Sequence, residues 1–130
     1  MKFLIDNNIS YRIAEALTAL DFEGDTVIAL RKEFRQDVPD TEWLESLGKQ
    51  AGVLITADRR ILTRPLEITV IKHAKITSFF LGPFFPKARF WEQAVWLIKR
   101  WPDFKNAARI IEQGTCLWVP QRGTMRPISP

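Results

Sequence analysis

Two acidic side chains stand where a sheet-based enzyme often places its chemistry. Asp6 directly follows the apolar run Lys2–Ile5, and Asp58 comes two residues after the apolar run Val53–Thr56. Short apolar runs of this kind are typical of strands buried on both faces of a parallel sheet. If both runs are such strands, Asp6 and Asp58 lie at the carboxyl edge of the sheet, where open α/β folds form their ligand crevice.

A third acid, Asp40, stands at the predicted start of the helix that leads into the second run, and Glu42 follows two residues later. Its distance from the other two depends on the path of residues 31–38. Crowded carboxylates repel one another, so such a cluster needs a proton or a cation. Oxygen ligands favour Mg²⁺ or Mn²⁺, which also bind phosphate oxygens. The chemistry that this set would perform is metal-dependent phosphodiester hydrolysis.

Helix capping is the simpler alternative for two of these acids. Aspartate is a favoured N-cap, and both Asp40 and Asp58 precede predicted helical residues. Asp6 is harder to explain in this way, because a charge beside a buried strand is costly unless it is paired. Asn7 and Asn8 add further polar groups at the same rim.

Apolar periodicity predicts an α/β fold with a parallel sheet, because strands and helices alternate along the first sixty residues. One helical turn is expected at 59–62, and residues 66–75 suit either a helix or a strand. Pro102 is expected to break the last helical region. The tail 120–130 holds three prolines, and we expect it to be extended or frayed after a single domain over 1–119. The predicted strands are 2–5, 26–30, 53–56, 76–81 and 116–119, and the predicted helices begin near residues 10, 39, 87 and 103.

The charge of the chain is divided between its two parts. Residues 1–58 carry six basic and eleven acidic side chains, whereas residues 59–130 carry thirteen and four. A basic surface attracts nucleic-acid phosphates, and Arg59 and Arg60 would add to it beside Asp58. An ordinary solvated surface explains the division equally well.

Several classes of protein are excluded by residue counts. The single Cys116 forms no disulfide within the chain and builds no cysteine zinc site, and the single His73 excludes a histidine cluster. We interpret His73 as a surface or hydrogen-bonded histidine. No stretch approaches the roughly 20 apolar residues of a membrane span, and Asp6 interrupts the apolar start too early for a signal peptide. We therefore expect a cytoplasmic protein.

Aromatic residues are concentrated between residues 79 and 101, where basic residues stand among them. Such a set could stack single-stranded RNA bases. Core packing together with a protein interface is the interpretation that we favour. The aromatic residues are Phe79, Phe80, Phe84, Phe85, Phe90, Trp91, Trp96 and Trp101.

Three segments resemble the PIN-like proteins of bacteria. The opening Met1–Ser10 resembles their first strand, which closes on an Asp-Asn element before a capped helix. Pro39–Leu44 resembles their acid-rich helix start, and Val53–Arg59 resembles their strand ending in Thr-x-Asp. The rest of the chain resembles, more loosely, the C-terminal part of a branch related to VapC-type toxins.

The resemblance implies a three-layer α/β/α PIN-like fold with a central, mainly parallel sheet. It also implies an endoribonuclease that uses Mg²⁺ or Mn²⁺, and a cognate antitoxin that blocks the site. The chain would then be the toxin of a bacterial toxin–antitoxin pair, with RNA as its substrate and a homodimer as a further expectation.

The same resemblance assigns roles to individual residues. Asp6, Asp40 and Asp58 would be the catalytic acids and metal ligands, with Glu42 as the substitute candidate for Asp40 and Asn8 as a supporting polar residue. Arg59, beside Asp58, would support the site by holding the nucleic-acid backbone. PIN nucleases usually carry a fourth acid near a later strand, yet nothing acidic lies between Glu67 and Glu92.

Two alternatives stay open, and the missing fourth acid favours the first. One is a catalytically impaired PIN-like module that only binds RNA or a partner. The other is a receiver-like phosphoryl-transfer domain of flavodoxin-like topology, which also gathers acids at strand ends.

Overall fold

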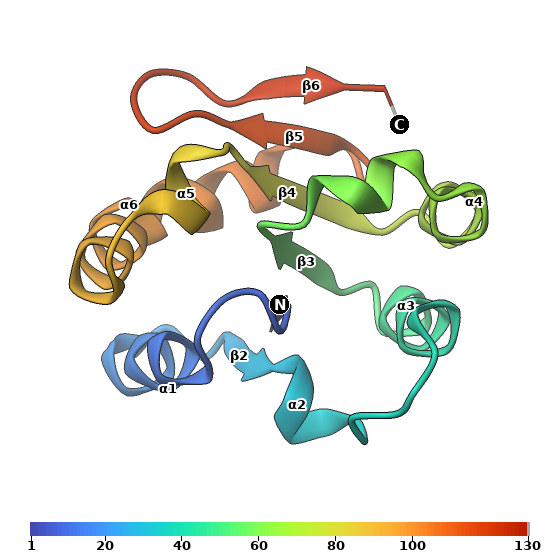
Figure 1. Ribbon diagram of the computed structural model, residues 1–130, viewed down its shortest axis with the longest axis horizontal. Coiled ribbons are helices and arrows are strands. Elements are labelled where there is room, and N and C mark those ends of the chain that lie inside the picture. Colours follow the sequence, from blue (N-terminus) through green and yellow to red (C-terminus); the bar gives the residue numbers. More distant parts are fainter. Residues whose placement is uncertain (130) are drawn as a thin grey trace.

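The computed structural model describes residues 1–129 and has an α/β architecture, shown in Figure 1. Its strands are β1 (Lys2–Ile5), β2 (Thr26–Ala29), β3 (Val53–Thr56), β4 (Thr77–Leu81), β5 (Cys116–Val119) and β6 (Arg126–Ile128). Its helices are α1 (Tyr11–Leu20), α2 (Leu30–Glu33), α3 (Asp40–Lys49), the 3₁₀ helix η1 (Arg59–Thr63), α4 (Pro65–His73), α5 (Phe84–Lys87) and α6 (Phe90–Ile110).

The strands form one sheet in the order β2-β1-β3-β4-β5-β6. The first five run parallel, and β6 alone is antiparallel to its neighbour β5. Ile5 is in register with Ile55, so the carboxyl ends of the neighbouring strands β1 and β3 are level. This register brings the residues that follow the two strands to the same edge of the sheet.

Helices cover both faces of the sheet, as Figure 1 shows with α1, α5 and α6 on one side and α3 and α4 on the other. Successive strand residues point to opposite faces. Phe3 and Ile5 therefore pack in the core beneath α1 and α6, whereas Leu4 packs in the core beneath α3 and α4. The expected three-layer α/β/α arrangement with a mainly parallel sheet is confirmed.

The ambiguous segment 66–75 is helical. Its β-branched residues suit a strand, but Pro65 at the first turn favours a helix start, and Ile71 packs in the core beside α3. Tertiary packing therefore decides between the two structures that the local sequence allows. The short helix α2 ends the predicted strand 26–30 one residue early and forms the first part of the connection 31–38, whose path the sequence left open.

The prediction that Pro102 breaks the last helical region was wrong. Helix α6 runs through Pro102 without interruption from Phe90 to Ile110. The residues on both sides of the proline, Leu97 and Phe104 among them, are buried in the same core. Their burial holds the two halves in one helix despite the backbone hydrogen bond that proline cannot donate.

The C-terminal tail is extended, as expected, but residues 126–128 do not fray. They pair with β5, with Pro127 opposite Leu117. The tail thus adds a sixth strand to the sheet.

An ion cluster joins α6 to the turn before β2, at the amino ends of the strands. Lys105 is 3% exposed, and its Nζ lies 2.9 Å from an oxygen of Asp21, 2.6 Å from one of Glu23 and 3.0 Å from one of Asp25. The N-terminal amine lies 3.0 Å from Asp25 as well. Across residues 1–129, no helix has the length and apolar character needed to cross a membrane.

Candidate active site

The carboxyl edge of the sheet gathers the three acids that the sequence singles out. Asp6 follows β1, and Asp58 follows β3 and the intervening Ala57. Asp40 is the first residue of α3, which runs back from this edge toward the amino end of β3. The parallel topology therefore brings residues from three separate stretches of the chain to one rim.

Asp6 is buried, with 7% of its surface exposed, and every hydrogen bond it makes is local to this edge. Its Oδ1 accepts a hydrogen bond of 2.7 Å from the Asn7 backbone N–H. Its Oδ2 accepts one of 2.8 Å from the Thr56 hydroxyl and a longer one of 3.4 Å from the Asn8 amide. These donors fix the orientation of the carboxyl group.

Asn8 and Thr56 tie the ends of β1 and β3 together. The Asn8 side chain accepts a hydrogen bond of 2.9 Å from the Ala57 N–H and donates one of 3.3 Å to the Thr56 hydroxyl oxygen. The same hydroxyl oxygen accepts a bond of 3.0 Å from the Asp58 N–H. Thr56 is fully buried, and sequence reasoning gave it no role. The sequence feature that could have identified Thr56 is its position as a polar residue at the end of an otherwise apolar strand.

Asp58 has the capping role that was the simpler alternative for it. Its Oδ1 accepts hydrogen bonds of 3.0 Å from both the backbone N–H and the Nε of Arg60, at the N-terminus of η1. Its Oδ2 lies 3.7 Å from Nη1 of Arg64. One oxygen of Asp58 thus caps η1, and the other faces the guanidinium of Arg64.

Asp40 does not cap its helix, because Pro39 occupies the cap position of α3. Its Oδ1 accepts a hydrogen bond of 2.9 Å from the indole of Trp43, and its Oδ2 lies 3.4 Å from Nη1 of Arg64. Glu42 is exposed on the same helix.

The charges of Asp40 and Asp58 act on Asp6. Burial raises the pKa of Asp6, hydrogen bonds from Thr56 and Asn7 oppose that effect, and the negative charges of Asp40 and Asp58 raise it further. Within residues 1–129, however, no three acidic, histidine or cysteine side chains are close enough to hold one ion together. The carboxylate oxygens suit Mg²⁺ or Mn²⁺ chemically, yet Arg64 stands between two of them.

The fourth acid that PIN nucleases usually carry has no counterpart at this edge among the described residues. Glu92, the first acid after β4, accepts a hydrogen bond of 3.1 Å from the Arg89 N–H and so caps α6.

A basic groove adjoins Asp58. It has a volume of about 590 Å³, and Arg59, Arg60 and Lys87 line it together with Asn8 from the acidic rim. The guanidinium of Arg59 lies 5.9 Å from the ring centre of Trp118 on β5. Cationic side chains from η1 and α5 thus line a groove beside Asp58, and side chains of this kind are the ones that contact a phosphate backbone.

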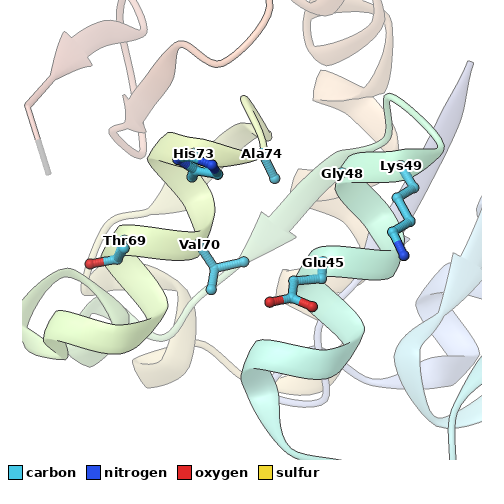
Figure 2. Close-up of a pocket in the computed structure, with 7 residues that line it drawn as sticks. All are labelled: Glu45, Gly48, Lys49, Thr69, Val70, His73 and Ala74. Atoms are coloured by element: carbon cyan, nitrogen blue, oxygen red, sulfur yellow. The ribbon is translucent and has the colours of Figure 1, made fainter.

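A second hollow, drawn in Figure 2, lies between α3 and α4 and has a volume of about 410 Å³. It is formed by the second halves of these helices, whereas Asp40 and Arg64 stand at their starts. It contains none of the predicted site residues. His73 lies on its border and is exposed, which confirms one of the two interpretations of this histidine, a surface residue.

The aromatic residues between 79 and 101 are mostly core residues, as favoured. Phe79, Phe80 and Phe85 are fully buried, but Phe90 and Trp91 at the start of α6 remain 38% and 77% exposed.

A family model described as a PIN like domain matches residues 1–83, which hold all three acids, Thr56 and Arg64. The chain belongs to the PIN-like domain family. Members of this family are often nucleases. Comparisons with curated proteins and with solved structures give no match.

Proposed function

We propose that this PIN-like protein is a Mg²⁺- or Mn²⁺-dependent endoribonuclease that hydrolyses RNA phosphodiesters at Asp6, Asp40 and Asp58. The observation that carries the proposal is the placement of Asp6. Its carboxyl group is buried at the edge of the sheet that also carries Asp40 and Asp58, and the negative charges of these two acids help to raise its pKa. Such an arrangement costs stability, and it is typical of functional sites that bind a cation.

The residues of the site divide into two groups by role. Asp6, Asp40 and Asp58 would hold the metal ion, which supplies a Lewis acid and a more acidic bound water. Thr56 and Asn8 orient Asp6 and keep the two strand ends together. Because electrostatic attraction to phosphates is independent of sequence, the groove formed by Arg59 and Lys87 would hold the RNA backbone rather than select bases.

The test is cleavage of single-stranded RNA by the purified chain in the presence of Mn²⁺ and then EDTA. We expect cleavage to require the metal and to be abolished in Asp6→Asn. Asp37→Asn is the matched control, because Asp37 has an 80% exposed side chain that pairs only with Arg35 among the described residues. Equal rates for Asp6→Asn and the parent would refute the assigned site.

We further propose that the chain is the toxin of a toxin–antitoxin pair, which rests on its likeness to VapC-type toxins. The antitoxin would cover the acidic edge and contact Phe90 and Trp91, which are exposed beside the groove residue Lys87. Inducible expression should slow bacterial growth, and Asp6→Asn should not. Normal growth with the parent chain, once RNA cleavage is established in vitro, would separate the nuclease from the toxin role.

The second candidate is a PIN-like module that binds RNA or a partner without cutting. It is favoured by the missing fourth acid and by the positive charge of Arg64 beside Asp40 and Asp58. Calorimetric titration with Mn²⁺ distinguishes the two functions, since a pure binding module has no need of a divalent site.

A further inference from the structure

We propose that Arg64 is an internal counter-ion that competes with the divalent cation for Asp40 and Asp58. The inference rests on the proposed function, because it concerns the same metal site. In this state the single charge of the guanidinium offsets part of the negative charge of the two acids, and the ion binds only after the arginine side chain has moved away.

The contacts of the two acids place Arg64 between them. Its Nη1 lies 3.4 Å from Oδ2 of Asp40 and 3.7 Å from Oδ2 of Asp58, so one nitrogen approaches both groups. The other oxygen of each acid is engaged elsewhere, by the Trp43 indole and by Arg60 respectively. Arg64 therefore lies against Oδ2 of both acids, the oxygens that make no other hydrogen bond or ion pair within residues 1–129.

A permanent structural role for these contacts is the main alternative. It is the weaker one, because α3 and α4 already pack through the buried side chains of Leu44, Leu47 and Ile71. Arg64 and Asp40 are also 37% and 41% exposed, and exposed ion pairs of this kind stabilise a fold only weakly. A doubly charged ion can displace a contact of that strength.

The local backbone limits how Arg64 can leave. Residue 64 is extended, with φ −100° and ψ 111°, and Pro65 begins α4 directly after it. A residue before proline is held in this region by steric contact with the proline ring. Release is therefore a rotation of the partly exposed side chain into solvent, with α4 remaining in place.

The experiment is calorimetric titration of Mn²⁺ into the full chain and three variants. In Arg64→Gln the competing charge is lost, and we expect the affinity for Mn²⁺ to rise about tenfold or more, as removal of one charge a few ångströms from the ion implies. Arg64→Lys retains the charge and should stay close to the parent. Arg126→Gln removes the same charge from β6, three strands away from β3, and controls for the change in net charge.

The titration has three informative outcomes for the competition between Arg64 and the ion. Tighter binding by Arg64→Gln alone supports the competition. Equal binding by Arg64→Gln and the parent overturns it and leaves the nuclease proposal standing. If none of the four proteins binds Mn²⁺, the metal site is wrong and the role of Arg64 falls with it. Thermal melting without metal verifies that each variant is folded.

Discussion

Replacement of Lys105 by methionine should destabilise the protein by about 3 kcal/mol at pH 7. Removal of one partner from a buried ion pair costs roughly 3–5 kcal/mol. Asp25 keeps the N-terminal amine as a partner, and Glu23 is 47% exposed, so both tolerate the loss. Asp21 has a 1% exposed side chain and keeps only neutral donors, which places the cost at the lower end of that range.

The pH dependence follows from the same contacts. Burial would raise the pKa values of Asp21 and Asp25, but the hydrogen bonds and positive charges around them, with Lys105 contributing to both, together outweigh it, and both pKa values are lowered. Their stabilising contribution is therefore complete above the unfolded-state value of about 3.9 and is lost as the pH falls through the folded-state values. The difference between parent and variant should shrink over that acid range.

The assay is urea denaturation of the parent and Lys105→Met, followed by tryptophan fluorescence at pH 7 and at pH 3. Lys99→Met is the matched control, since Lys99 is an exposed lysine of the same helix. A loss below about 1 kcal/mol at pH 7, or a loss that is unchanged at pH 3, would refute the reasoning.

Three further predictions concern the site and the helices around it. Because the pKa of Asp6 is raised, its ionisation weakens the fold as the pH rises, so Asp6→Asn should melt higher than the parent at pH 7 and equally at pH 3. Thr56→Val should lose about 1–3 kcal/mol in urea denaturation, because it removes a buried hydroxyl that bonds to Asp6, Asn8 and Asp58; an unchanged midpoint would contradict that role. Gly48→Ala should lose about 1–3 kcal/mol, since its Cβ would lie 2.4 Å from the Cβ of Ala74 and force α3 from α4; a neutral result would show that the helices separate freely.

Much of the fold was predictable because its strands are short apolar runs with polar ends. Strands β1 and β3 and the helices that follow or precede them lie close to where the periodicity places them. The exceptions arise where tertiary packing outweighs local preference. The β-branched residues of α4 suit both a helix and a strand, and the packing of Ile71 in the core favours the helix. Pro102 does not break α6, because the turns on both sides of it are held in the core.

The site was predictable in part for the same reason. A parallel sheet brings residues after adjacent strands to one edge, so the sequence alone predicts that Asp6 and Asp58 lie at the same edge. Arg64 could not be assigned a role, because its contact with Asp40 depends on how η1 turns into α4. The residue spacing does not predict how the chain turns between η1 and α4.

Strand β6 covers an edge of the sheet, the edge of β5, that would otherwise be open to strands of other chains. Without residues 126–128, the unpaired N–H and C=O groups of β5 would form an open margin, a template for strand addition and aggregation. Proline at position 127 gives the new margin one donor fewer and makes it a poorer template. Shortened versions of this protein that end at residue 119 should therefore self-associate, even though every residue of the acidic edge would still be present.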